Sequence, residues 1–464
     1  MTTSPPPPGS ERLLAALRQL GSVATSAQLQ AALQASQPTV SRALAPLLDA
    51  GRVGKVGAAR SQRYLLLRSV RGVGTQVPLW RIDTQGRPAP FAQMWALAGG
   101  AFWVEEADGV RERHDGLPWF LADMRPQGFM GRHFAQRHPD LALPQDPHHW
   151  SDDDALRALA LCGEDLPGNL LVGAASLARF AALAPQLVQA QSAADYPALA
   201  RSALQGQWPG SSAGGEQPKF CCVTAGRSVI VKFSPAGDSL AEQRLRDLLH
   251  CEHLALHTLA QAGLPAAPTQ VFERAGRVFL QSERFDRRSP WPGLVDGPPP
   301  GRIGMVSLLV YDAQYIGETD NWAATALRMR AHQPPLLTGA DAMTLRLLEA
   351  YGQLIGNTDR HYGNISLVLE NDDWRLSPSY DMLPMRYMPI AGEVVAQDFA
   401  PAQLQPTAAT ADVWLQAQAL AQAFWQAAAQ EARISAPFRQ LATGHAQALA
   451  GVVSGETVSY NDPP

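Results

Sequence analysis

One segment constrains the fold of this chain more than any other: a polar loop directly before a short apolar run. The loop reads GNTDRHYGN over residues 356–364, and the apolar run Ile365 to Leu369 follows it. Asp359 and Asn364 stand five residues apart in the loop, and a second aspartate, Asp381, comes just past the next strand and turn. This order of loop, strand, turn and carboxylate is typical of the catalytic half of a kinase-like fold.

These side chains have the chemistry that phosphoryl transfer requires. The reaction needs a group that orients the attacking hydroxyl and accepts its proton, and ligands for Mg²⁺ on the phosphates of ATP. Asp359 is the candidate catalytic base, and Asn364 and Asp381 are the candidate Mg²⁺ ligands. The alternative is that Asp359 caps a helix and that Asp381 lies in a solvated turn.

An upstream segment could cover the nucleotide. Residues 211–220 read SSAGGEQPKF, which is neither of the common glycine-rich phosphate motifs and could alone be a turn. Small residues let backbone N–H groups approach a phosphate closely. The candidates are Ala213, Gly214 and Gly215. A strand with Lys232 follows, and the predicted amphipathic helix Asp247 to Ala262 carries Glu252, which would reproduce the lysine–glutamate ion pair of kinases. A solvated helix face is the other interpretation of Glu252.

The adenine site is expected where the next strands end. Val229 to Phe233, Gln270 to Glu273 and Arg277 to Ser282 are predicted strands. The segment Gln281 to Phe285 then falls where a hinge would bond the purine through backbone groups. After about Ile303 the pattern is mostly helical, so we expect an α+β chain with a mixed first lobe and a mostly helical second lobe.

The first 70 residues differ from the rest in charge. They hold eight Lys and Arg but two Asp and Glu, a net +6, whereas the whole chain carries −4. Helices are expected over Glu11 to Leu20, from Ser26 to about Ala35, and from Ser36 to Gly51. Two short strands, Val53 to Gly57 and Arg63 to Leu67, follow. Three helices and a hairpin predict a winged helix-turn-helix domain.

This basic head is a candidate DNA-binding domain. The N-terminal end of the third helix enters the major groove in helix-turn-helix proteins, and basic residues of the wing contact phosphates. The helix would present Gln37, Thr39, Ser41 and Arg42, and the wing region would present Arg52, Lys55, Arg60 and Arg63. The alternative is a winged helix that serves only protein contacts or dimerisation.

Composition indicates an intracellular protein. The four cysteines (Cys162, Cys221, Cys222 and Cys251) have no CxxC spacing, so we expect reduced, buried thiols. The first residues lack a basic and an apolar signal region, and the most apolar stretch, Leu170 to Val188, is interrupted by Arg, Gly and Pro. A cytoplasmic location without membrane contact is the expectation.

Taken together, the motifs resemble those of a known family. SSAGGEQPKF, VKF, SERFDR, GNTDRHYGN and SPSYDMLP occur here in the order seen in HipA-family serine/threonine kinases, the toxins of HipA/HipB-type toxin–antitoxin modules. They span residues 211–384, and the fold would extend from about Pro78 to the end. The basic head makes the chain similar to the YjjJ branch, in which the toxin carries its own helix-turn-helix.

The resemblance implies four segments and a role for each site residue. The segments are a disordered leader (1–10), the winged helix-turn-helix domain (11–70), the first kinase lobe with a HipA-type N-terminal subdomain (77–288) and the second lobe (289–464). Asp359 would be the base, Asn364 and Asp381 the Mg²⁺ ligands, Lys232 the ATP-phosphate ligand, and the backbone near Glu283 and Phe285 the adenine site.

Autophosphorylation is a further implication of the family. A loop serine takes the phosphate, which ejects the loop and silences the enzyme. By position this serine is Ser212, with Ser211 beside it. A phosphate inside a phosphate-binding loop would repel ATP. Glu216 and the paired serines depart from the commoner family pattern, so the modified residue is less fixed than the catalytic one.

Partners and competing functions follow from the same resemblance. It implies a protein substrate in translation, with an aminoacyl-tRNA synthetase as the first candidate, a HipB-like antitoxin, and a homodimer on palindromic DNA. Lipid kinases of the phosphoinositide type share the DRHxxN loop, but residues 71–464 are acidic, which argues against a lipid surface. Two more functions compete with a protein kinase: a DNA-bound regulator that senses nucleotide, and a small-molecule kinase.

Overall fold

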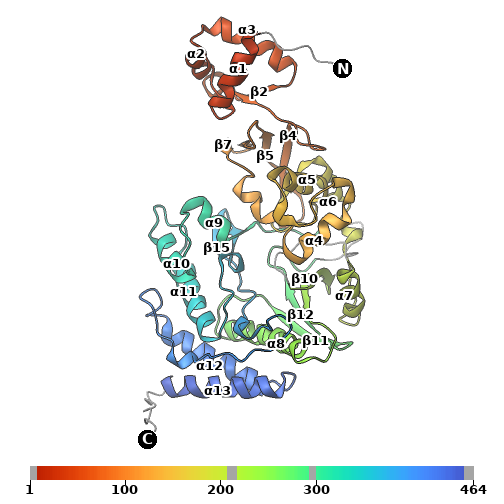
Figure 1. The fold of residues 1–464 in the computed structure, drawn as a ribbon, viewed down its shortest axis with the longest axis vertical. Helices are drawn as coiled ribbons and strands as arrows, with labels where there is room; N and C mark the ends of the chain where they lie inside the picture. The colour runs from red at the N-terminus through yellow and green to blue at the C-terminus, as the bar shows by residue number, and fades with distance from the viewer. Residues whose placement is uncertain (1–7, 206–216, 292–298, 454–464) are drawn as a thin grey trace.

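The structure is a computed structural model that describes residues 8–205, 217–291 and 299–453. Figure 1 shows an N-terminal unit at one end, a middle region below it, and two lobes that face each other. The strands of the described residues form four antiparallel sheets, and helices pack around them. The fold therefore mixes helices and sheets, as expected.

The N-terminal unit, residues 8–66, has three helices and a small sheet in the order β1-β3-β2. Its core contains Leu13, Leu17, Leu29, Val40 and Leu44, which lie at helical spacing. The elements are α1 (Pro8–Gln19), β1 (Val23–Ala24), α2 (Ser26–Leu33), α3 (Gln37–Asp49), β2 (Val53–Val56) and β3 (Arg63–Leu66).

Two helix starts in this unit differ from the sequence expectation. Helix α1 begins at Pro8, three residues before Glu11, and residues 1–7 of the expected leader lie outside the described part. Helix α2 is capped by Thr25 instead of Ser26. The Thr25 hydroxyl accepts a hydrogen bond from the Gln28 N–H, and the Gln28 side chain accepts one from the Thr25 N–H.

The middle region contains a five-stranded sheet in the order β7-β6-β5-β4-β8, with helices beside it (Figure 1). Its strands are β4 (Gln76–Ile82), β5 (Pro88–Ala96), β6 (Phe102–Glu106), β7 (Arg111–His114) and β8 (Leu170–Val172). The helices of this stretch are α4 (Gly128–Arg137), α5 (Asp152–Cys162), α6 (Gly173–Ala181) and α7 (Tyr196–Leu204), of which α7 packs on the sheet of the first lobe. Arg113 Nε donates to Gly21 O at 2.8 Å, which joins this sheet to the N-terminal unit.

The first lobe is a four-stranded sheet, β11-β12-β10-β9, with one long helix. Its elements are β9 (Lys219–Thr224), β10 (Arg227–Phe233), α8 (Leu240–Gln261), β11 (Thr269–Arg274) and β12 (Arg277–Glu283). The three predicted strands of this part are confirmed. Helix α8 starts seven residues before the expected Asp247, because Ser239 and Glu242 form a capping box.

The second lobe is mostly helical, as predicted, and the strand and turn predicted between Asn364 and Asp381 form the hairpin β14–β15. Its largest core joins α8 to the last helices through Leu348, Phe424, Trp425 and Phe438. The elements are β13 (Met305–Ser307), α9 (Leu308–Tyr315), α10 (Trp322–Ala331), α11 (Gly339–Leu354), β14 (Ser366–Glu370), β15 (Asp373–Leu376), α12 (Trp414–Gln430) and α13 (Ala436–Val453). Within the described ranges, no helix combines the length and apolar character that crossing a membrane would need.

Candidate active site

Lys232 lies where the two lobes meet. It is on the central strand β10, and its Nζ lies 2.7 and 2.9 Å from the two carboxylate oxygens of Glu252 on α8. The same Nζ contacts a carboxylate oxygen of Asp381, which comes from the segment after β15 in the second lobe. The predicted strand–helix ion pair is therefore present. The contact with Asp381 was not predicted, because the sequence does not show how the two lobes are positioned relative to each other.

Lys232, Glu252 and Asp381 form a triad in which opposite charges stabilise one another. Burial alone would lower the pKa of Lys232, but the carboxylates of Asp381 and Glu252 outweigh burial and raise it. Burial would raise the pKa of Asp381, but Lys232 and Lys219 more than offset burial and hold it below its ordinary value. Burial raises the pKa of Glu252. Lys232 is therefore a persistent cation beside a persistent Asp381 anion.

Asp381 is fixed by its backbone and by its neighbour Tyr380. Its φ of 55° lies in the left-handed region, which aspartate tolerates better than most residues. The Tyr380 hydroxyl lies 2.7 Å from Ser366 Oγ and donates to Gly363 O at 3.0 Å. These contacts tie the Asp381 segment to the loop that carries the candidate base.

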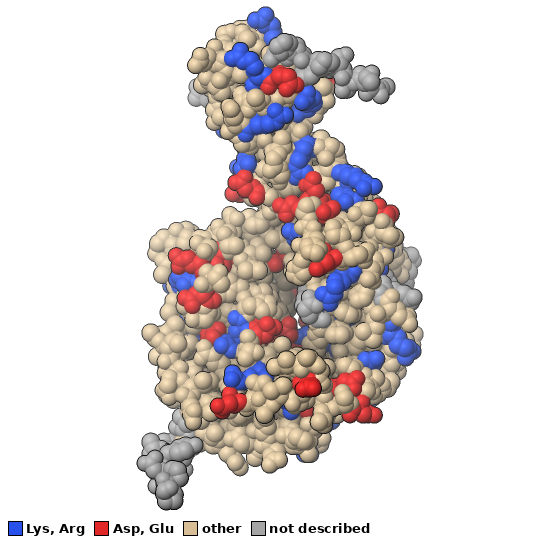
Figure 2. Space-filling model, viewed as in Figure 1, with Lys and Arg blue, Asp and Glu red and all other residues tan. Residues whose placement is uncertain are grey.

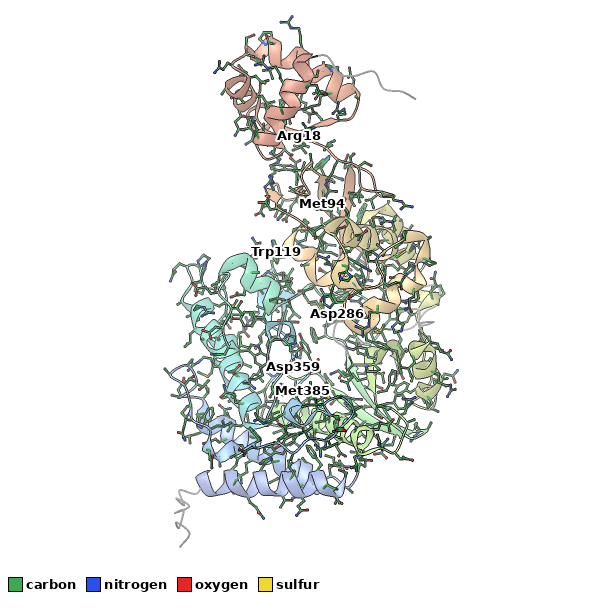
Figure 3. All side chains as sticks on the ribbon, viewed as in Figure 1. Arg18, Met94, Trp119, Asp286, Asp359 and Met385 are labelled. Atoms are coloured by element: carbon green, nitrogen blue, oxygen red, sulfur yellow. The ribbon has the colours of Figure 1, made fainter. Side chains whose placement is uncertain are left out.

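That loop has an internal set of hydrogen bonds that orients Asp359. The buried Asn357 accepts from the Asp359 N–H at 2.9 Å, and Asn364 Nδ2 donates to the Asp359 carbonyl and carboxylate at 2.9 and 3.2 Å. Arg360 turns inward, and its Nε pairs with the buried Glu349 at 3.0 Å. The Asp359 side chain, which Figure 3 labels between the two lobes, remains 46% exposed, so an incoming hydroxyl could reach it.

His361 belongs to this site, although the sequence analysis gave it no role. Its Nε2 lies 3.6 Å from Asp359 Oδ1, and its charge is among the influences that lower the pKa of Asp381. It thus lies beside the candidate base. Its position within the loop motif, two residues after Asp359, was the available signal. The sequence analysis also gave no role to Lys219, which lies opposite Lys232 on the neighbouring strand β9.

The candidate metal ligands offer a donor set that suits Mg²⁺. Asp381 supplies an ionised carboxylate and Asn364 an amide oxygen, and both come from the second lobe. The described residues contain no cluster of three His, Cys, Asp or Glu side chains that could hold a metal. Mg²⁺ is usually held by one or two protein ligands together with substrate phosphates and water.

The hinge candidates lie at the end of β12. The N–H of Glu283 donates to Pro268 O at 3.0 Å and its carboxylate pairs with Arg227 at 2.6 Å, so these groups already have partners. Phe285 is half-buried, and its ring centroid lies 5.6 Å from that of Tyr380. Phe285 therefore borders the Asp381 segment, whereas the Glu283 side chain is engaged with the neighbouring strand.

Five candidates of the small-residue loop lie outside the described residues. They are Ser211, Ser212, Ala213, Gly214 and Gly215. Their roles in phosphate binding and autophosphorylation stay predictions.

The DNA-binding candidates lie on the N-terminal unit, where Figure 2 shows several Lys and Arg side chains. The candidates of α3 are all exposed, whereas Val40, Leu44 and Leu47 of the same helix are buried. They are Gln37, Thr39, Ser41 and Arg42. Arg52 and Lys55 are exposed, Arg63 is half-buried, and the side chain of Arg60 lies outside the described set.

Comparison with known proteins identifies the family. A model of the YjjJ-like toxin middle domain matches residues 73–181, and a model of the HipA-like C-terminal domain matches residues 211–449. The toxin YjjJ of Escherichia coli K12 is 36% identical over 426 residues, which cover 89% of this chain and 92% of that protein. The chain belongs to the YjjJ-like HipA toxin family.

The match to the HipA-like domain includes every candidate from Lys232 to Asp381. A solved HipA from Shewanella oneidensis, in a complex with HipB and operator DNA, is similar with a TM-score of 0.50 at 14% identity. The similarity covers 81% of this chain and 97% of that one, and it shows a shared fold. In this YjjJ-like toxin the N-terminal unit precedes both matched domains.

Replacing Lys232 with Met should lower the free energy of unfolding by about 3 kcal/mol near pH 8, because Glu252 and Asp381 lose their shared cation. The loss should shrink near pH 5. Glu252 already has a raised pKa, and without Lys232 the pKa of a carboxylate rises further above its unfolded value. As the pH falls, the folded variant therefore binds more protons than the unfolded variant, and this binding restores part of the lost stability. Urea denaturation at both pH values measures the two losses.

The matched control is Lys55→Met, at an exposed lysine, which should change stability by no more than about 0.5 kcal/mol. The double variant Lys232→Met with Glu252→Gln should recover part of the loss near pH 8. An equal loss at both pH values, with no recovery in the double variant, would contradict the coupled triad.

Proposed function

We propose that this chain is a toxin kinase that transfers the γ-phosphate of ATP to a serine or threonine hydroxyl of a protein. The observation that carries the proposal is the contact of Lys232 with both Glu252 and Asp381, beside the loop that orients Asp359. Kinases need this strand-lysine to helix-glutamate pair together with an aspartate that holds the metal. Membership of the HipA toxin family supports the same function.

Each residue of the site has one task in this proposal. Lys232, held in place by Glu252, binds phosphate oxygens, which would compete with Asp381 for its Nζ. Asp359 orients the substrate hydroxyl and takes up its proton, and Asn364 holds the Asp359 carboxylate in position. Bound Mg²⁺, on Asn364 and Asp381, would neutralise charge on the phosphates.

The substrate and the regulation are proposed from the family resemblance. The substrate is a component of translation, with an aminoacyl-tRNA synthetase as the first candidate, and such a substrate would place the toxin in the cytoplasm. Autophosphorylation of Ser212, or of its neighbour Ser211, would silence the enzyme because the added charge of about −2 repels ATP.

We further propose that the N-terminal unit is a winged helix-turn-helix domain that binds DNA. Its three helices and sheet leave the N-terminal end of α3 exposed, with Arg42 on that face, as groove-reading helices require. The solved HipA relative was captured with HipB and operator DNA. By analogy, this toxin would bind its own operator, as a homodimer if the operator is palindromic, and could also meet a HipB-like antitoxin.

The direct test of kinase activity is incubation of the purified chain with ATP and Mg²⁺, followed by intact mass measurement and phosphopeptide mapping. The unaltered chain should gain a phosphate on Ser212 or Ser211. Asp359→Ala should slow the gain by about a hundredfold or more, because a positioned base contributes at least that factor. Asp373→Ala, at an exposed aspartate of the nearby hairpin, is the control and should keep the normal rate.

The competing function makes a different prediction in the same assay. If the chain gains no phosphate and binds ATP weakly, yet shifts DNA, then a DNA-bound regulator with a nucleotide-sensing domain replaces the kinase.

DNA binding is tested by the salt dependence of affinity for the region upstream of the chain's own gene. Lys55→Ala should weaken binding evenly across sequences and reduce the salt slope by about one, as loss of one phosphate contact does. Arg42→Ala should lower affinity by about 1–3 kcal/mol if it reads a base. Arg330→Ala, exposed in the second lobe, is the control. Unchanged DNA binding in both variants of the N-terminal unit would mean that this unit serves protein contacts instead.

A further inference from the structure

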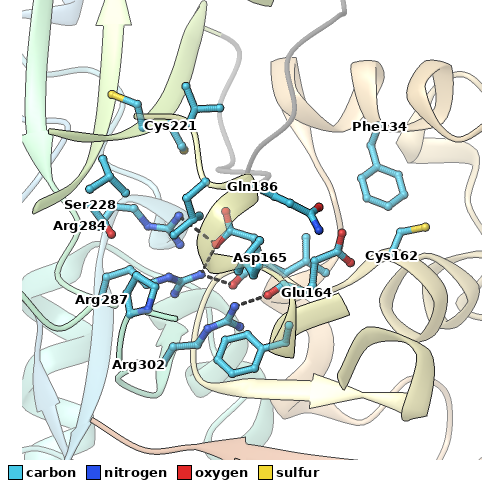
Figure 4. A pocket seen from close by; sticks show the side chains of 18 of the residues that line it. Phe134, Cys162, Glu164, Asp165, Gln186, Cys221, Ser228, Arg284, Arg287 and Arg302 are labelled. Atoms are coloured by element: carbon cyan, nitrogen blue, oxygen red, sulfur yellow. Dashed lines mark hydrogen bonds and ion pairs between the residues drawn. The ribbon is translucent and has the colours of Figure 1, made fainter. Parts of the chain in front are cut away.

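A cavity of about 340 Å³ lies apart from the triad, between the middle region and the sheet of the first lobe. Figure 4 shows Phe134 and Cys162 on its middle-region side and Cys221 and Ser228 on its first-lobe side. Its volume falls at the lower end of the range of small-molecule sites. Apart from Arg284, which lies in the candidate hinge segment, the proposed function uses none of the residues that line it.

The walls of the cavity are apolar over most of their area, and one end is charged. Four arginines reach it (Arg137, Arg284, Arg287 and Arg302), whereas the carboxylates that line it are Glu164 and Asp165. Positive charge therefore exceeds negative charge among the described lining residues.

Arg302 is the unusual member of the charged end. It is 2% exposed, its Nη2 donates to the Glu164 carbonyl, and its guanidinium lies 4.7 Å from the Phe180 ring centroid. Its Nε and Nη1 have no hydrogen-bond partner in the described part of the chain. Burial lowers the pKa of Arg302, which marks an environment that disfavours an uncompensated cation. Leaving buried donors unsatisfied costs about 1–3 kcal/mol, so such groups usually have a function.

The carboxylates of Asp286 and Asp165 are already engaged by neighbouring arginines. Arg284 and Arg287 pair with Asp286 at 2.8 and 2.7 Å, and Arg287 also pairs with Asp165 at 2.9 Å. Burial raises the pKa of Glu164, and its Oε2 has no partner among the described residues. Arg302 thus lies beside the ion pairs of Asp286 and Asp165 and forms no ion pair of its own among the residues that the structure describes.

We propose that this cavity binds a small organic anion. Its carboxylate or phosphate group accepts hydrogen bonds from Arg302 Nε and Nη1, and its apolar body packs against Phe134, Phe180 and Leu183. The site would bridge the middle region and the first lobe. It adjoins the hinge segment, because Arg284 lies between Glu283 and Phe285.

Calorimetric titration of the full chain with octanoate, a carboxylate on an aliphatic body, tests the site. Saturable binding of one molecule per chain is expected. Arg302→Met should weaken it by at least about tenfold, and octanamide, the uncharged analogue, should bind weaker than octanoate by a similar factor. Arg302→Met should still fold, because replacing an unpaired buried cation with an apolar side chain removes a desolvation cost.

Two further variants make the result decisive. Leu183→Trp should reduce binding by filling the cavity without touching Arg302, and Arg330→Met, at an exposed arginine outside the cavity, should bind as the unaltered chain does. No saturable binding, or binding that Arg302→Met leaves unchanged, would overturn the proposal. The titration requires no phosphoryl transfer, so its outcome is independent of the proposed kinase activity.

Discussion

The contact of Lys232 with two carboxylates is the interaction on which the rest of the site depends. One carboxylate belongs to α8 of the first lobe and the other to the segment after β15 of the second lobe, so a single ammonium group sets the relative position of the two. Charged groups at such burial are tolerated only when they are paired. Removal of the lysine would therefore disturb both strand β10 and the candidate metal ligand.

Other contacts between distant segments fix the same geometry. Tyr380 ties the Asp381 segment to Gly363 and borders Phe285 of the hinge. Asp123, in the middle region, accepts from the Ser307 hydroxyl at 2.9 Å at the start of α9. The candidate catalytic loop is thus placed by its own internal hydrogen bonds and by the contact of Tyr380 with Gly363. This is why Asp359 can stay partly exposed while the residues around it are buried.

The sequence was most informative where chemistry depends on local spacing. The five-residue interval between Asp359 and Asn364 was enough to predict that the two side chains belong to the same site. In the structure they lie within hydrogen-bond distance of each other. The strand and helix around Lys232 and Glu252 could be recognised from periodicity, and their ion pair is present. The Lys232–Asp381 contact and the Arg302 cavity could not be predicted, since both join segments more than a hundred residues apart. The start of α8 was missed although Ser239 and Glu242 had the capping-box spacing.

The central claim is that the Lys232 triad is a nucleotide-phosphate site. Calorimetric titration with ATP and Mg²⁺ tests it most directly, on the unaltered chain and on Asp381→Asn, with Asp373→Asn as the control at an exposed aspartate of the same hairpin region. The account predicts Mg²⁺-dependent binding that Asp381→Asn weakens by at least about tenfold and the control leaves unchanged. Equal affinity in all three proteins, or binding that does not respond to Mg²⁺, would contradict it.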